Sequence, residues 1–114
     1  MIKVVIGRHD GYICSYRVSG HAGYADQGKD IICSAMSMIA INTANSLSAL
    51  ADETFDVAQD DDSGLLEIRF DHKPNEKAEL LLDSLELGVQ GVIDQYGNEF
   101  VSLTYINEKM ADDK

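Results

Sequence analysis

Residues 1–19 alternate between apolar and polar side chains, with one interruption in the middle. The alternation runs over residues 1–8 and again over residues 12–19, and a period of two is typical of a strand with one buried face. His9-Asp10-Gly11 separates the two runs, and glycine adopts positive φ at no steric cost. The pattern predicts a β-hairpin, so the chain must form an antiparallel sheet that another layer covers.

Two later stretches carry helical patterns. Residues 31–50 are mostly apolar or small and carry little charge, which predicts a central helix that is buried on several sides. Residues 78–96 carry one apolar stripe at spacings of three and four, which predicts an amphipathic helix. Pro74 suits the first turn of this second helix, and Gly97 suits its end.

Three shorter segments complete the expected order of elements. Residues 54–59 and 65–70 predict two strands joined by a hairpin turn, and residues 100–106 predict a last strand. The order is therefore β-β-α-β-β-α-β. We expect an α+β fold in a single domain over residues 1–114, with a mostly antiparallel sheet and two helices. The polar tail over residues 107–114 is expected to fray.

The composition limits the partners and the compartment. Nine Lys and Arg residues oppose 20 Asp and Glu residues, which gives a formal net charge of -11. Such a surface disfavours direct nucleic acid binding, and it either attracts a basic partner or serves solubility alone. We expect no membrane span, and residues 1–10 are typical of a strand and not of a signal peptide. These features favour a cytoplasmic protein in which Cys14 and Cys33 are thiols.

A cysteine and a histidine flank a stretch that has neither strand nor helix periodicity. This stretch, residues 20–29, contains three glycines, so we expect a mobile loop. Asp30 has the character of a helix N-cap, which would place Cys33 in the first turn of the central helix, where a thiolate is favoured. His21 lies twelve residues before Cys33 and could fold back to act as its base. From spacing alone, a structural cysteine in an apolar helix is the commoner explanation.

The motif around this pair is more specific than its spacing. It consists of Gly20-His21-Ala22, a glycine-bearing loop, the run Gly28-Lys29-Asp30-Ile31-Ile32-Cys33-Ser34-Ala35, and then Ser37.

This motif resembles that of the Prp family of bacterial cysteine proteases, and the length and element order suit that family. The resemblance implies a Cys33–His21 catalytic pair and no cofactor. It also implies a homodimer whose substrate is the precursor of ribosomal protein twenty-seven of the large subunit, from which it removes an N-terminal extension.

Several residues near the pair have more than one interpretation. Asp30 either caps the helix or orients His21, and the cap is favoured because it follows from spacing. Ser37 lies one turn beyond Cys33 and either hydrogen-bonds near the site or fits where a larger side chain would not. The residues expected to form the substrate loop are Gly20, Ala22, Gly23, Tyr24 and Gly28.

Metal-binding alternatives have little support. A zinc site formed by His9, Cys14, His21 and Cys33 lacks any paired-ligand spacing, and Cys14 has the position of a core residue. The acidic run over residues 60–64 lacks the loop length and terminal glutamate of a calcium-binding loop, so a hairpin turn is expected there. His72 is expected to be exposed.

Two functions from different classes remain open from the sequence. The first is a cysteine endopeptidase that acts on a basic ribosomal protein precursor. The second is a non-catalytic ribosome-assembly module that binds the same protein, in which Cys33 and His21 are structural. Thiol reactivity distinguishes them, since a catalytic Cys33 should react with iodoacetamide much faster than Cys14.

Overall fold

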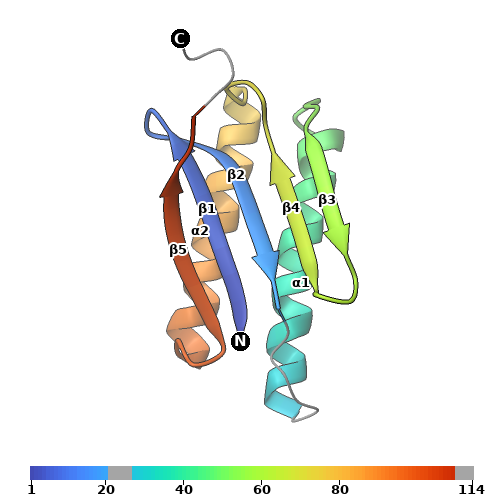
Figure 1. Ribbon diagram of the computed structural model, residues 1–114, viewed down its shortest axis with the longest axis vertical. Coiled ribbons are helices and arrows are strands. Elements are labelled where there is room, and N and C mark those ends of the chain that lie inside the picture. Colours follow the sequence, from blue (N-terminus) through green and yellow to red (C-terminus); the bar gives the residue numbers. More distant parts are fainter. Residues whose placement is uncertain (21–26, 110–114) are drawn as a thin grey trace.

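The computed structural model describes residues 1–20 and 27–109 of the chain, and of residues 27–30 only the backbone. Its elements are β1 (Ile2–His9), β2 (Tyr12–Ser19), α1 (Gln27–Ala49), β3 (Asp56–Asp60), β4 (Leu65–Arg69), α2 (Glu76–Tyr96) and β5 (Val101–Asn107). The predicted order of elements is confirmed. Both helices lie against the same face of the sheet, so the domain has two layers (Figure 1).

The sheet has the strand order β3-β4-β2-β1-β5. The pairs β1–β2, β2–β4 and β3–β4 are antiparallel, and only β1 with β5 is parallel. The prediction of a mostly antiparallel sheet is therefore confirmed. The strand order was not derivable from the sequence, because nothing in the pattern of β5 shows that α2 carries the chain back to the edge beside β1.

The β1–β2 hairpin contains a β-bulge that the alternation of side chains does not reveal. Gly7 pairs with Ser15 and Arg8 pairs with Ile13, so Cys14 is the extra residue on β2. The bulge reverses the faces beyond it: Ile13 and Tyr16 both belong to the core beneath the helices, whereas buried Cys14 does not. The prediction that Cys14 is buried is confirmed, but the bulge places its side chain outside the cluster that contains Tyr16.

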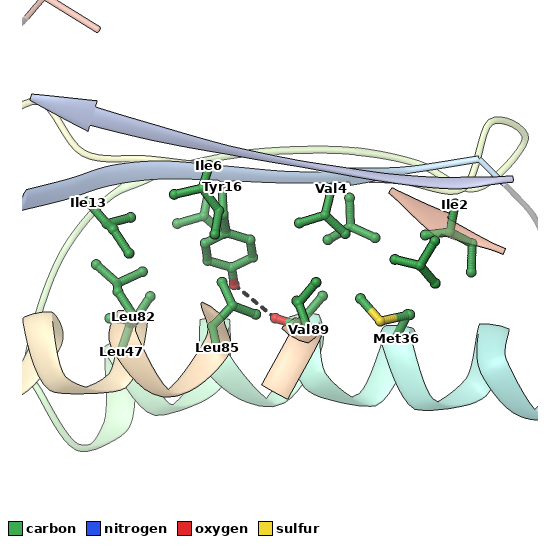
Figure 2. Packing of buried hydrophobic residues seen from close by; sticks show 14 of the residues in the cluster. Ile2, Val4, Ile6, Ile13, Tyr16, Met36, Leu47, Leu82, Leu85 and Val89 are labelled. Carbon is green, nitrogen blue, oxygen red and sulfur yellow. Dashed lines mark hydrogen bonds between the residues drawn. The ribbon is translucent and has the colours of Figure 1, made fainter. Parts of the chain in front are cut away.

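One hydrophobic core fills the space between the sheet and the helices (Figure 2). From α1 it receives Ile32, Met36, Ala40 and Leu47, which lie on one side of the helix. The first helix is thus buried on one face only, and the prediction that it is buried on several sides is wrong. Outside that face its apolar side chains are exposed: Ile31 by 58%, Met38 by 65% and Ile41 by 44%.

The stretch Ile31–Ala49 of α1 is long and apolar enough to cross a membrane by length and composition alone. This corrects the expectation that no part of the chain has those properties. The same helix supplies core residues along its length and lies flat on the sheet (Figure 1). Packing in the core of the domain therefore accounts for the apolar side chains on one face of this helix, while only 28% of the stretch is buried.

The ends of α2 follow specific backbone requirements. Asn75 is the N-cap, and its side chain accepts a hydrogen bond from the backbone N–H of Ala78 at 2.9 Å. Pro74 therefore precedes the cap, and the prediction that it lies in the first turn is wrong. At the other end, Gly97 adopts φ 89° and its N–H donates to the carbonyl of Ile93, which confirms the predicted C-cap.

The tail over residues 107–114 is expected to fray, but its first residues are held against the sheet. Asn107 is the last residue of β5, and the backbone N–H of Glu108 donates to the carbonyl of Arg8 at 2.8 Å. The Glu108 carboxylate forms an ion pair with Arg69 and is only 11% exposed. Residues 110–114 lie outside the described part of the chain.

Candidate active site

Cys33 lies in the second turn of α1, because the helix begins at Gln27. The prediction that Asp30 is the N-cap is therefore wrong. Gly28 also lies within the helix, and its contact with the substrate stays a prediction. The electrostatic effect of a helix N-terminus fades after the first turn, and a backbone N–H in the second turn is already hydrogen-bonded within the helix. The proximity of the helix start cannot by itself activate Cys33 or supply an oxyanion hole beside it.

The side chain of Cys33 is half-buried and packs against the hydrophobic core cluster. It is therefore neither sealed in the core nor fully surrounded by solvent. Cys14 and Cys33 are both reduced. A half-buried thiol at the edge of the core is accessible to a peptide on one side while the protein holds it in place on the other.

Gly20 directly follows β2, which ends at Ser19. It adopts φ +88°, and a Cβ on it would lie 2.5 Å from the backbone oxygen of Met1. Its N–H donates to the carbonyl of Ser63 in the β3–β4 turn at 2.9 Å. Gly20 is thus a fixed anchor, where the sequence predicted a position with few restraints.

The end of β2, the β3–β4 turn and the N-terminal half of α1 lie at the same end of the domain (Figure 1). The residues predicted to join Cys33 there are His21, Ala22, Gly23 and Tyr24. All four lie outside the described residues, so the Cys33–His21 pair stays a prediction. The same holds for the orienting role of Asp30, whose side chain is not described.

Ser37 is exposed and lines a hollow between α1 and the β3–β4 hairpin. This hollow also contacts Val18, Ile41, Asp60 and Asp61. A second hollow continues from it along α1 toward Ser48. Ser37 therefore lies in the groove one helical turn beyond Cys33.

A second cysteine and a second histidine, Cys14 and His9, both contact Glu108 near the opposite end of β2. The Sγ of Cys14 lies 3.9 Å from the carboxylate of Glu108, and the Nδ1 of His9 lies 2.8 Å from the backbone oxygen of the same residue. Burial and the charge of Glu108 raise the pKa of Cys14. A fully buried thiol beside a carboxylate is a poor nucleophile, so this pair does not compete with Cys33 for the catalytic role.

The same geometry removes the predicted alternative of a zinc site. Cys14 lies on the face of the sheet that is turned away from the helices, under the side chain of Glu108. Cys33 belongs to α1 on the other face. The sheet separates the two thiols, so they cannot share a metal ion.

Sequence reasoning missed the groove and the bulge. The groove arises because the β3–β4 hairpin overlies the flank of α1, which depends on the strand order. The bulge had a signal in Gly7, since a glycine within a strand often marks one. The predicted hairpin turn before Leu65 is confirmed.

Comparison with known proteins gives a consistent match. The family model described as Cysteine protease Prp matches residues 1–101. The ribosomal processing cysteine protease Prp of Staphylococcus aureus is 31% identical over 106 residues, which cover 92% of this chain and 99% of that protein.

Two crystal structures of an essential ribosomal processing protease Prp from S. aureus have the same fold. One contains a covalently linked product peptide; it matches with a TM-score of 0.84 and 31% identity, over 93% of this chain and 100% of that one. The other contains a substrate peptide; it matches with a TM-score of 0.79 and 28% identity, over the same shares of both chains. The family match over most of the chain, the relative that is matched over 99% of its length and the shared fold together show that this chain belongs to the Prp family of cysteine proteases.

Proposed function

We propose that this protein is a cysteine endopeptidase that removes the N-terminal extension of ribosomal protein twenty-seven of the large subunit. The observation that carries the proposal is the position of Cys33, a half-buried thiol one helical turn before Ser37, which lines an open groove. The relative from S. aureus is named as a ribosomal processing protease, and one of its structures holds a covalently linked product peptide. A covalent product is what a cysteine nucleophile would leave.

In the proposed reaction, His21 takes the proton from the Cys33 thiol, and the thiolate attacks the carbonyl carbon of the scissile peptide bond. The C–N bond breaks as His21 returns the proton to the leaving amine. Water, deprotonated by His21, then hydrolyses the thioester and releases the other product with the thiol restored. No oxidant, metal or cofactor enters this balance.

Asp30 acts as a positioning residue for His21 in this proposal. Asp30 and Cys33 are three positions apart in α1, so they are neighbours on the helix surface. Because the helix begins before Asp30, capping no longer accounts for this residue. A carboxylate that holds the imidazole in one tautomer is the usual third member of such a site.

The surroundings proposed for the enzyme follow from its charge and its family. A chain with a formal net charge of -11 attracts a basic ribosomal protein and repels nucleic acid. A homodimer in the cytoplasm is proposed with the family resemblance.

The test is incubation with the full-length precursor and measurement of the product mass. Wild-type protein and Cys14→Ala should shorten the precursor at one site, whereas Cys33→Ala and His21→Ala should leave it intact while remaining folded by circular dichroism. If Cys33→Ala cleaves normally, the nucleophile assignment is wrong. If the wild type binds the precursor tightly and never shortens it, the protein is an assembly module and not a protease.

A further inference from the structure

A groove runs between α1 and the underside of the β3–β4 hairpin. It consists of two hollows of about 160 Å³ and about 320 Å³. Both hollows contact Ile41, Gln59 and Leu66, so they lie next to each other along the helix, and the groove consists of the two together. The smaller hollow lies nearer the start of α1 and includes Ser37; the larger one reaches Ser48.

The groove is aligned with Cys33. In an α-helix, residues four positions apart lie above one another on one side. Cys33, Ser37, Ile41 and Asn45 follow this spacing, and the last three line the groove. A substrate peptide whose scissile carbonyl lies at Cys33 can therefore continue along this side of α1 without changing direction.

The separation of the hollows matches the repeat of an extended peptide. A helix rises about 1.5 Å per residue, which puts the hollows roughly 10 Å and 17 Å along α1 from Cys33. An extended chain advances about 3.3 Å per residue, so these distances correspond to about the third and the fifth residue from the scissile bond. Side chains two positions apart point to the same side of a strand, so both can enter the groove together.

The two hollows differ in chemistry. The smaller hollow is lined by Asp60 and Asp61, whose carboxylates suit a cationic side chain. The larger hollow is lined by Ile41 and Val57, which are 44% and 56% exposed in the absence of a partner, and by Phe55. A second apolar side chain that covered these residues would gain hydrophobic free energy on binding.

We propose that this groove determines specificity by binding the substrate as an extended chain on one side of the scissile bond. The smaller hollow takes a Lys or Arg side chain about three residues from that bond, and the larger hollow takes an apolar side chain about five residues from it. The inference rests on the proposed function in that it requires Cys33 to be the nucleophile. The acidic net charge of the chain favours approach of such a basic segment.

The first test measures kcat/KM for cleavage of the full-length precursor by groove variants. Asp60→Asn combined with Asp61→Asn removes both charges, and asparagine keeps the side-chain oxygen with which Asp60 accepts from the N–H of Asp62. This variant and Ile41→Glu should each lower kcat/KM by about tenfold or more, because a paired charge or a buried apolar contact is lost. The control is Met38→Glu, since Met38 is 65% exposed on the same helix and does not line the groove. It should cleave normally.

A binding measurement separates this inference from the proposed function. Fluorescein-labelled peptides carrying one Lys and one Leu separated by a single residue, in both orders, are titrated against Cys33→Ala protein. Replacing Lys by Glu, or increasing the separation to two residues, should weaken binding at least fivefold. The groove substitutions placed on the Cys33→Ala background should remove that preference.

Failure of the groove inference and failure of the proposed function give different experimental results. If the precursor is cleaved and neither the charge variant nor Ile41→Glu changes kcat/KM relative to Met38→Glu, the groove does not read the substrate and the inference is overturned. If the precursor is never cleaved and the peptide preference still depends on the groove, the proposed substrate is wrong and the groove assignment stands. Peptide binding that ignores charge and spacing overturns the inference whatever the precursor does.

Discussion

The hydroxyl of Tyr16 in β2 donates a hydrogen bond of 2.8 Å to the backbone carbonyl of Ala40 in α1 (Figure 2). Both residues are buried, and burial raises the pKa of Tyr16 well above its usual range, so the hydroxyl stays neutral and keeps its proton. Ala40 also lines the smaller hollow of the groove. This bond between the middle of the sheet and the middle of the helix therefore fixes the position of the helix that carries Cys33.

Replacing Tyr16 by Phe should lower the free energy of unfolding by about 1 kcal/mol, since one buried hydrogen bond is lost while the ring still fills its place. Urea denaturation measures this change. Tyr96→Phe is the control, because Tyr96 is 42% exposed at the end of α2, and it should have almost no effect. Equal stability of wild type and Tyr16→Phe would show that the bond contributes nothing to the position of the helix.

The two cysteines should differ strongly in reactivity. Cys14 is fully buried and its pKa is raised by burial and by Glu108, whereas Cys33 is half-buried. Iodoacetamide near neutral pH should therefore modify Cys33 first, and peptide mass mapping should find Cys14 unmodified until the protein unfolds. Cys33→Ala should leave a protein that reacts slowly, and Glu108→Gln should make Cys14 more reactive. Labelling of both cysteines at one rate would contradict the difference in burial.

His72, in the loop before α2, contacts the loop that follows α1. Its Nδ1 lies 2.7 Å from a carboxylate oxygen of Asp71, and its Nε2 lies 2.7 Å from a carboxylate oxygen of Glu53. Another oxygen of Glu53 accepts from the backbone N–H of Asn75 at 2.7 Å. The side chain of His72 is 38% exposed, which agrees in part with the expectation that it is exposed, and two acidic residues hold its ring.

The stability that His72 contributes should depend on pH. Its hydrogen bond to Asp71, and to a smaller extent its hydrogen bond to Glu53, raise the pKa of His72. The folded state therefore favours the charged imidazole. The contribution is complete below the ordinary histidine pKa of about 6.5 and is lost as the pH rises through the folded value. The hydrogen bond between His72 and Asp71 also lowers the pKa of Asp71. The stability that this bond contributes is therefore lost as the pH falls through the pKa of Asp71 in the folded state.

Unfolding measured from pH 4 to pH 9 for wild type and His72→Gln should show this dependence. The difference in free energy between them should be largest near pH 5 to 6 and should shrink at higher pH. Asp71→Asn should show a smaller pH dependence of the same direction, because Glu53 remains. A difference that is constant across the range would mean that His72 acts through packing on Phe70, whose ring it contacts edge-on, and not through charge.

Gly7 provides space for two neighbouring side chains at the bulge. A Cβ on Gly7 would lie 2.2 Å from the Oγ of Ser15 and 2.8 Å from the Cγ of Glu108. Gly7→Ala should therefore lower the free energy of unfolding by about 1–3 kcal/mol through overpacking, and it should displace Glu108 from Arg69. The matched control is Gly91→Ala in α2, where a Cβ would meet nothing within 4 Å. That change should raise stability by about 0.5–1 kcal/mol through helix propensity, and destabilisation by both variants would contradict the steric explanation.

The sequence by itself determined the kinds of elements and their order. The alternation of residues 1–8 and the stripe over residues 78–96 record one-sided burial, which a strand or helix expresses locally and which the structure reproduces. Gly97 likewise ends its helix because its positive φ is a property of the residue itself. The motif from Gly20 to Ser37 identified the family for the same reason, since a motif is contained within one segment.

Only the tertiary structure decided what depends on partners distant in sequence. The extent to which α1 is buried was mispredicted because an apolar composition does not say how many faces a helix packs, and here the sheet covers one. The face on which Cys14 lies does not follow from the alternation of residues 12–19, because the bulge opposite Gly7 is a property of the β1–β2 pairing and not of β2 alone. The groove beside Cys33 exists because β3 and β4 meet α1 at one edge of a sheet whose strand order no local pattern encodes.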